Sequence, residues 1–551
     1  MKKQFYFIFT FIWIFNTMNA QGLLDKKAPE FTRQDTLRGS ITKGRAWWNV
    51  KSYHLAIKVN PADSTISGSN TIKYLVLQKY NTMQIDLQKP MQITKVVQDG
   101  KTLTYKREEN VFFIELLAPQ IKGTQMELVV FYKGKPKVAV NPPWDGGITW
   151  KKDANGKPFI ASSCQGLGAS VWWPNKDHMY DEVENMKISV NVPGDLTNVS
   201  NGRLLNVKKL KDGTKTYNWY VSNPINNYGV NINIGDYVTF SEQYKGEKGN
   251  LDCTYYVLRD NLAKAKKQFQ DVPRMLKAFE HWFGPYPFYE DSYKLVEAPY
   301  LGMEHQSSVT YGNKFENGYL GRDLSGTGWG LKFDFIIIHE SGHEWFANNI
   351  TYKDIADMWI HESFTNYSES LFVEYYYGKE AGFEYVRGTR NGIENDKPII
   401  GNYNVNNEGS ADMYSKGGNM LHTLRQIVNN DEKWRGILRG LNRTFYHQTV
   451  TTKQIEEYMS QEVGRDLNPF FNQYLRDTRI PTLEYYVDGN TLKYHWTNII
   501  AGFDIPVKVS LNGTEVSLNP KSEWSEFNNS TKIESVVLNP NFYVLNKKIE
   551  K

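Results

Sequence analysis

The segment Ile338-His339-Glu340-Ser341-Gly342-His343-Glu344 is the most informative part of this 551-residue sequence. Isoleucines precede it and an apolar Trp-Phe-Ala run follows, so the segment is expected to form a buried helix. Residues four apart lie on the same face of an α-helix, one above the other. The imidazoles of His339 and His343 can therefore reach a single metal ion at about 2.0–2.1 Å. Glu340 is then placed to accept a proton from a water molecule that the metal activates.

The alternative is that the two histidines belong to the core and bond to backbone groups or to carboxylates. Ionisable side chains are rarely buried without a partner. A metal ion provides such a partner for both rings at once, so we interpret the pair as metal ligands.

A zinc site needs a third protein ligand and one open position. Glu362 begins the next predicted helix, with eighteen residues between it and His343, and an antiparallel helix would bring its carboxylate beside the two rings. His361 is a rival ligand, but adjacent residues on a helix point about 100° apart. We favour Glu362 because apolar residues at 364, 367 and 371 pack on its side of the helix. The sequence thus predicts one zinc ion per chain.

These motifs resemble those of the M1 family of gluzincin aminopeptidases, in which H-E-x-x-H is followed by eighteen residues and a Glu. Further matches are Trp345, Asn348, Thr351 and a W-x-x-E-x-F segment at Trp359, Glu362 and Phe364. The resemblance implies that His339, His343 and Glu362 bind zinc and that Glu340 is the general base.

Gly302-Met303-Glu304 resembles the centre of the G-x-M-E-N exopeptidase motif of the same family. The resemblance implies that these three residues bind substrate and that Glu304 pairs with its free α-ammonium group. Leu301 and His305 differ from the family motif, which affects the fit around the first substrate residue. Because histidine titrates near neutral pH, His305 is expected to modulate amine binding.

Two more substrate-site residues follow from the resemblance. Gln165, in Ser-Cys-Gln-Gly, matches a Gln that lines the first substrate pocket, and Tyr414 matches the Tyr of a Y-x-K-G segment that stabilises the oxyanion. Metal-bound histidines also donate their second N–H to an acceptor. Glu369 is the first candidate for that acceptor and Glu344 is the alternative.

The expected fold is a multidomain α+β protein. Alternating runs at 53–59, 111–114, 127–132 and 187–192 predict a β-sandwich-like domain over 21–250. Helical patterns at 261–283, 331–349, 362–377, 417–428, 432–441, 452–463 and 467–475 predict a mainly α catalytic domain over 251–480, which the resemblance describes as thermolysin-like. A hairpin at 483–487 and 491–496 predicts a small β-sandwich over 481–551.

Residues 1–20 have the pattern of a cleaved signal peptide, with Lys2 and Lys3 before an apolar run that ends at Phe15. The protein is therefore expected to be exported to the periplasm or secreted, with no stable membrane span after cleavage. Cys164 and Cys253 are expected to be free, buried thiols. A net charge of +5 without a dense basic block gives no support for nucleic-acid binding, and nothing in the sequence indicates an oligomeric state.

The sequence thus predicts a zinc aminopeptidase that removes single residues from peptides with a free N-terminus. Two alternatives stay open. One is a zinc endopeptidase or other hydrolase with the same site, and the other is a catalytically silent relative that binds peptides.

Overall fold

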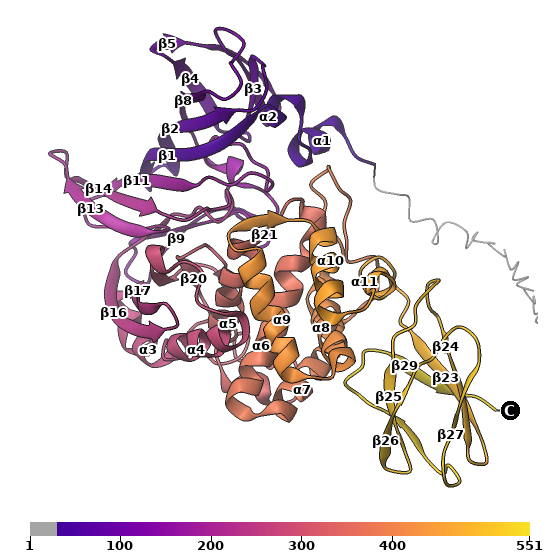
Figure 1. Cartoon of the computed structure of the whole chain (residues 1–551). Coiled ribbons are helices and arrows are strands. Elements are labelled where there is room, and N and C mark those ends of the chain that lie inside the picture. The colour runs from indigo at the N-terminus through magenta and orange to yellow at the C-terminus, as the bar shows by residue number, and fades with distance from the viewer. Residues whose placement is uncertain (1–29, 551) are drawn as a thin grey trace, which may run out of the picture.

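The computed structural model describes residues 30–550, which form three regions in chain order (Figure 1). β-sheets at the N-terminus are followed by a helical region and by a separate set of strands near the C-terminus. The predicted signal peptide lies outside the described residues. Within them, no helix combines the length and the apolar character needed to cross a bilayer.

The N-terminal region is built on an eight-stranded sheet with the order β13-β14-β11-β1-β2-β8-β4-β5. Its two central strands, β1 (Trp48–Asn60) and β2 (Thr65–Val76), pair along their length, and β11 (Asn185–Pro193) runs parallel to β1. The flanking strands are β4 (Gln92–Gln98), β5 (Lys101–Thr102), β8 (Gln125–Gly134), β13 (Arg203–Lys209) and β14 (Thr214–Val221). The strands predicted at 53–59, 127–132 and 187–192 are all present in this sheet.

Two smaller sheets complete this region. One has the order β3-β7-β6 and the other β12-β15-β10-β9. Their strands are β3 (Thr82–Asp86), β6 (Thr104–Glu108), β7 (Val111–Glu115), β9 (Gly147–Lys152), β10 (Pro158–Ser163), β12 (Thr197–Val199) and β15 (Asn233–Gly235). Cys164 directly follows β10 and is buried, as is Cys253, and neither forms a disulfide.

The second region begins with a five-stranded sheet that the sequence patterns did not reveal. Its order is β16-β17-β18-β20-β19, with β16 (Tyr237–Gly246), β17 (Gly249–Leu258), β18 (Tyr293–Glu297), β19 (Gly302–Met303) and β20 (Val309–Tyr311). The domain boundary predicted at residue 250 falls where β16 and β17 form a hairpin. Residues 296, 298, 300 and 303 belong to the same hydrophobic core as the N-terminal sheets. The segment that carries Glu304 is therefore anchored between the two regions.

Helices pack on this sheet and on one another to form the core of the second region. They are α3 (Leu262–Gln268), α4 (Asp271–Phe283), α5 (Phe335–Gly342), α6 (Trp359–Tyr377), α7 (Lys379–Gly388), α8 (Ser415–Val428), α9 (Asp431–Thr444), α10 (Thr452–Val463) and α11 (Asn468–Leu475). Gly378 ends α6 with a φ of 96°, a conformation that glycine adopts without strain.

Two predicted helices are shorter than the sequence patterns indicated. The pattern over 261–283 is divided between α3 and α4. The pattern over 331–349 starts only at α5, because the Asp334 carboxylate caps the helix by accepting from the N–H groups of Ile336 and Ile337. After His343 the chain enters a wider π-type turn, and it leaves helical geometry at Phe346. Apolar periodicity continues through this break, so it could not be seen in the sequence.

The third region has two sheets, β27-β24-β23-β29 and β26-β25-β28, as expected for a small β-sandwich. The predicted hairpin corresponds to β23 (Thr482–Asp488) and β24 (Thr491–Thr497). The other strands are β25 (Val507–Leu511), β26 (Thr514–Leu518), β27 (Ser525–Asn528), β28 (Val536–Leu538) and β29 (Leu545–Lys548).

Candidate metal centre and substrate cavity

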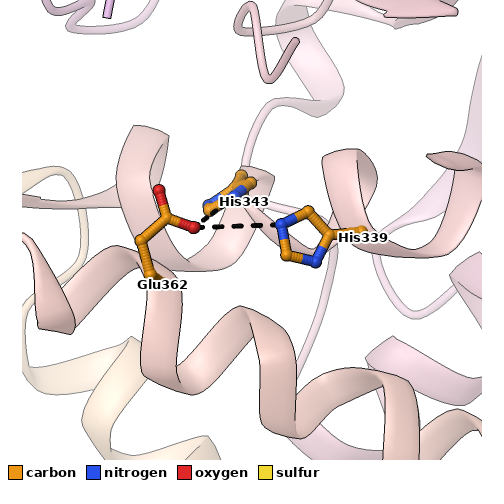
Figure 2. A group of neighbouring side chains, drawn as sticks. All are labelled: His339, His343 and Glu362. Carbon is orange, nitrogen blue, oxygen red and sulfur yellow. Dashed lines mark ion pairs between the residues drawn. The ribbon is translucent and has the colours of Figure 1, made fainter. Parts of the chain in front are cut away.

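Three buried side chains converge on one point: His339 from α5, His343 from the residue directly after α5, and Glu362 from α6 (Figure 2). The Oε2 atom of Glu362 lies 3.4 Å from Nε2 of His343 and 3.8 Å from Nε2 of His339. The three ligand atoms all lie within 4.8 Å of one another. Helical backbone through His343 keeps the two rings on one face, and α6 brings Glu362 against that face.

The geometry of this triad fits a zinc ion. Tetrahedral ligands at about 2.0–2.1 Å from zinc are separated by about 3.4 Å, which is close to the two distances above. Glu362 Oε2 is buried and has no hydrogen-bond partner among the described residues. Two imidazoles and one carboxylate form a donor set that zinc prefers, and they leave one coordination position open.

The electrostatics of the metal-free triad also favour a bound cation. Burial alone would lower the pKa of His343, but the facing carboxylate of Glu362 raises it to about 10. Burial alone would raise the pKa of Glu362, but the two rings hold it at about 2. The ionised carboxylate thus holds a positive charge beside it, which in the metal-free site is the proton on His343 and which a bound metal ion would replace.

Each ligand is held by a second contact. Nδ1 of His339 lies 2.8 Å from Oε1 of Glu369, whose other oxygen accepts from the hydroxyl of Tyr385. Nδ1 of His343 lies 3.0 Å from the carbonyl oxygen of Phe346, which the break after α5 directs toward the ring. Such contacts fix the tautomer that leaves Nε2 free for a metal.

The structure distinguishes between the alternatives that the sequence left open. Glu369 contacts a ligand histidine, whereas Glu344 accepts instead from the Tyr286 hydroxyl and the N–H of Ser307. His361 is turned away from the triad, because its Nε2 accepts from the N–H of Tyr352 and its ring stacks on that tyrosine. Glu369 therefore orients the site, and His361 is not a ligand.

The triad opens into a cavity of about 500 Å³ that lies between the N-terminal and helical regions. It contains every substrate-site residue predicted from the sequence. The lining residues include Gln165, Gly302, Met303, Glu304, His339, Glu340, His343, Glu362 and Tyr414. Tyr414 comes from the residue before α8, and its ring stacks on that of His339 with centroids 6.1 Å apart.

Glu340 is held close to Gly302. A Cβ atom on Gly302 would lie 2.8 Å from Oε1 of Glu340 and 2.7 Å from Cγ2 of Ile336. Burial raises the pKa of Glu340 to about 7. The carboxyl is thus poised to exchange protons near neutral pH, as a general base does.

Gln165 lines the cavity, and its side-chain amide contacts a metal ligand. Its Nε2 donates to Oε1 of Glu362 at 3.0 Å. Because Oε2 of the same carboxylate faces the two rings, Gln165 orients a metal ligand. The sequence did not predict this contact between the N-terminal region and the metal centre.

Glu304 is buried at the edge of the cavity, and burial raises its pKa. Its neighbour His305 was expected to titrate near neutral pH, and that expectation is wrong. His305 is only 1% exposed, and burial lowers its pKa to about 3. The ring is therefore neutral and cannot tune amine binding by titration.

Sequence reasoning missed two residues at this site. Tyr228, from the N-terminal region, donates its hydroxyl to Oε1 of Glu304 at 3.0 Å. Trp144 is 63% exposed and lines the cavity. No motif marked either one, although an exposed tryptophan in the run Asn-Pro-Pro-Trp-Asp could have been singled out as a binding residue.

Comparisons with known proteins agree with this architecture. The Peptidase family M1 domain matches residues 268–474, and the Peptidase M1 N-terminal domain matches residues 49–228. The M1 zinc metallopeptidase of Deinococcus radiodurans superimposes with a TM-score of 0.68 at 20% identity, covering 80% of this chain and 95% of that one.

Curated relatives include leukotriene A-4 hydrolase of Xenopus laevis, 23% identical over 75% of this chain and 68% of that protein. Probable aminopeptidase 2 of Sulfurisphaera tokodaii is 20% identical over 82% of this chain and 58% of its own length. Leucyl aminopeptidase of Saccharolobus solfataricus is 21% identical over 78% of this chain, which spans about half (54%) of that relative. With both family domains matched in order and the zinc triad assembled, this chain belongs to the M1 peptidase family.

Proposed function

We propose that this protein is a zinc-dependent aminopeptidase that hydrolyses the N-terminal peptide bond of peptides. The main support is that Glu304 lines the same cavity as the metal triad and Glu340. A buried carboxylate there attracts a free ammonium group and obstructs longer chains that would run past it. Two curated relatives are named aminopeptidases, and a variant of the Deinococcus enzyme binds a Tyr-Ser-Ala substrate.

The roles of the residues follow from their positions. Zinc, when bound, lowers the pKa of a water molecule to about 7 and polarises the scissile carbonyl. Glu304 holds the substrate ammonium. Glu340 accepts the proton of the attacking water and returns it to the leaving amine. Tyr414 donates its hydroxyl proton in a hydrogen bond to the carbonyl oxygen as negative charge develops there.

Matched peptides test this proposal. The zinc-loaded protein should release the first residue of a free peptide, such as Leu-Gly-Gly, and should leave its N-acetylated form intact. An endopeptidase would cleave a longer acetylated peptide internally, and a silent relative would cleave neither while still holding zinc. Mass spectrometry of the products and metal analysis separate these three outcomes.

We also propose that the protein is exported, on the basis of the basic, apolar and small-residue pattern of residues 1–20. N-terminal sequencing of protein recovered from the periplasm or medium should give a chain that begins near Gln21. Recovery of the intact N-terminus from the cytoplasm alone would contradict export.

A further inference from the structure

We propose that Tyr228 is a positioning residue that holds the Glu304 carboxylate where it receives the ammonium group of the substrate. The proposal rests on the proposed aminopeptidase function and adds a residue from the N-terminal region to the recognition of the substrate N-terminus. The two residues are far apart in sequence, but their side chains meet at 3.0 Å.

The direction of this hydrogen bond defines what Tyr228 does. A phenol has one proton to donate, and Tyr228 donates it to Oε1 of Glu304. Tyr228 is 3% exposed and Glu304 2% exposed, so bulk water does not compete for the bond. A donor fixed on one oxygen sets the rotation of the carboxyl group. The second oxygen then remains for a substrate ammonium.

The same stretch of the N-terminal region also fixes the backbone of Glu304. Nδ2 of Asn348 donates to the carbonyl oxygen of Glu304 at 2.8 Å, and Nδ2 of Asn226 donates to Oδ1 of Asn348 at 3.3 Å. Oδ1 of Asn226 accepts from the N–H of Gly229 at 2.6 Å, which orders the turn around Tyr228. Residues 226–229 therefore hold the Glu304 carboxylate directly, through Tyr228, and support its backbone indirectly, through Asn348.

The neighbour of Glu304 does not provide this support. Nδ1 of His305 lies 3.4 Å from Oγ1 of Thr310, and Nε2 is buried without a hydrogen-bond partner among the described residues. The orientation of the Glu304 carboxylate thus depends on a contact from the other side of the domain interface.

Tyr228 acts through Glu304 and does not itself touch the substrate. It does not line the 500 Å³ cavity of the metal centre. It lines a neighbouring small pocket of about 30 Å³, which shares Gly166 with the main cavity and has room for little more than a water molecule. We therefore expect Tyr228 to affect recognition of the amine and to leave the chemical step almost unchanged.

The test measures how much a free amine contributes to binding. The probes are leucine hydroxamate and its des-amino analogue, 4-methylpentanohydroxamate, titrated calorimetrically into the zinc-loaded full chain. The dissociation constant of the des-amino compound, divided by that of leucine hydroxamate, reports the contribution of the ammonium contact alone. In Tyr228→Phe this ratio should fall about tenfold or more, because a hydrogen bond to a charged group is lost, while the des-amino compound binds as it does to the wild type.

Tyr217→Phe is the matched control. The Tyr217 hydroxyl is also buried in the N-terminal region, but it donates to the carbonyl oxygen of Leu196, away from the cavity. This variant should keep the wild-type ratio. Glu304→Ala should bring the ratio close to one and so set the lower limit of the measurement.

Kinetics with leucine anilide provide a second readout. KM should rise in Tyr228→Phe by a larger factor than kcat falls, with zinc content unchanged. An unchanged ratio of dissociation constants in a folded, zinc-loaded Tyr228→Phe protein would overturn the positioning role. Failure of the wild-type protein to cleave free peptides would instead overturn the proposed function, because the calorimetric ratio does not depend on turnover.

Discussion

At the scale of single residues, the proposed role of Glu340 as general base can be tested by substitution. Glu340→Gln keeps the shape of the side chain but removes its basicity, so kcat should fall by about 10²–10⁴-fold. Its carboxylate is not part of the metal triad, so zinc should remain bound at wild-type stoichiometry. Parallel measurement of leucine anilide turnover and zinc content checks this. Wild-type turnover in this variant would remove Glu340 from the mechanism.

Gly302 tests how tightly that carboxylate is held. A methyl group at this position would displace Glu340 or Ile336, because both lie under 3 Å from the new Cβ atom. A shift of this size near the reacting atoms can cost up to about a hundredfold in rate. Gly302→Ala should therefore lower kcat while zinc content stays constant.

Gly436→Ala is the control for that variant. A Cβ atom at this exposed position of α9 meets nothing within 4 Å, and alanine is the better helix former. Activity should be unchanged. An equal loss of activity in both variants would mean that the effect of Gly302→Ala is not local to Glu340.

The part of the site that could be predicted from sequence is local or lies within one helical pair. His339 and His343 share a face because helical geometry relates residues four apart, and Glu362 follows from the return of one helix onto another. Contacts that cross the domain interface leave no such spacing. Tyr228 meeting Glu304 and Gln165 meeting Glu362 therefore could not be predicted, and the burial that keeps His305 neutral depends on the packed structure.

At the scale of elements, the α5–α6 pair sets the orientation of the ligands. Glu369 lies two turns along α6 from Glu362 and binds the outer nitrogen of His339. Glu369→Gln removes the negative charge from that contact. Zinc affinity should fall by about 10–100-fold, measured by competition with a calibrated chelator.

Glu344→Gln provides the comparison, because Glu344 directly follows the ligand His343 but bonds elsewhere. Its zinc affinity should stay near that of the wild type. If the two variants lost zinc equally, the contact between Glu369 and His339 would not be what orients the ring.

The break after α5 shows where helix prediction fails. Apolar residues flank the H-E-x-x-H segment on both sides, at 336–338 and at 345–347, so periodicity alone extends one helix through it. In the structure the backbone turns at Phe346 and presents a carbonyl oxygen to His343. The regular helix ends here, and the carbonyl oxygen of Phe346 becomes the hydrogen-bond acceptor for the ring of His343.

At the scale of the whole molecule, the metal should also stabilise the fold. A zinc ion held by His339, His343 and Glu362 would join α5 to α6 and offset the charge of the buried Glu362 carboxylate. Free zinc at a thousandfold above its dissociation constant would add about 4 kcal/mol to the free energy of unfolding. A chelated sample should therefore melt at a lower temperature than the zinc-loaded one, and re-addition of zinc should restore the melting temperature. Equal melting curves would contradict this coupling.

Acid should destabilise the protein through its buried neutral histidines. Burial lowers the pKa of His178 to about 3, whereas the unfolded chain titrates near 6.5. The unfolded state thus binds a proton first as pH falls, and stability is lost from about pH 6.5 down to about pH 3. At pH 5 this amounts to about 2 kcal/mol for one such group.

His178→Gln isolates that contribution. The ring nitrogen Nε2 contacts the carbonyl oxygen of Gly39, a bond that a Gln amide can replace without titrating. Urea denaturation at pH 7.5 and pH 5 should show a drop in unfolding free energy that is smaller by about 2 kcal/mol in the variant. An identical drop in both proteins would show that His178 is not responsible.

The contacts of Gln165 and Tyr228 have a consequence for how this protein could be divided or rearranged. The helical region contains all three metal ligands, yet the side chains that orient the carboxylates of Glu362 and Glu304 come from loops of the N-terminal region. The helical region without the N-terminal region would retain the three metal ligands. It would lose the hydrogen bonds that orient the carboxylates of Glu362 and Glu304. If the proposed function holds, exchange of the N-terminal region between relatives should alter which peptide N-termini bind, even with every zinc ligand left in place.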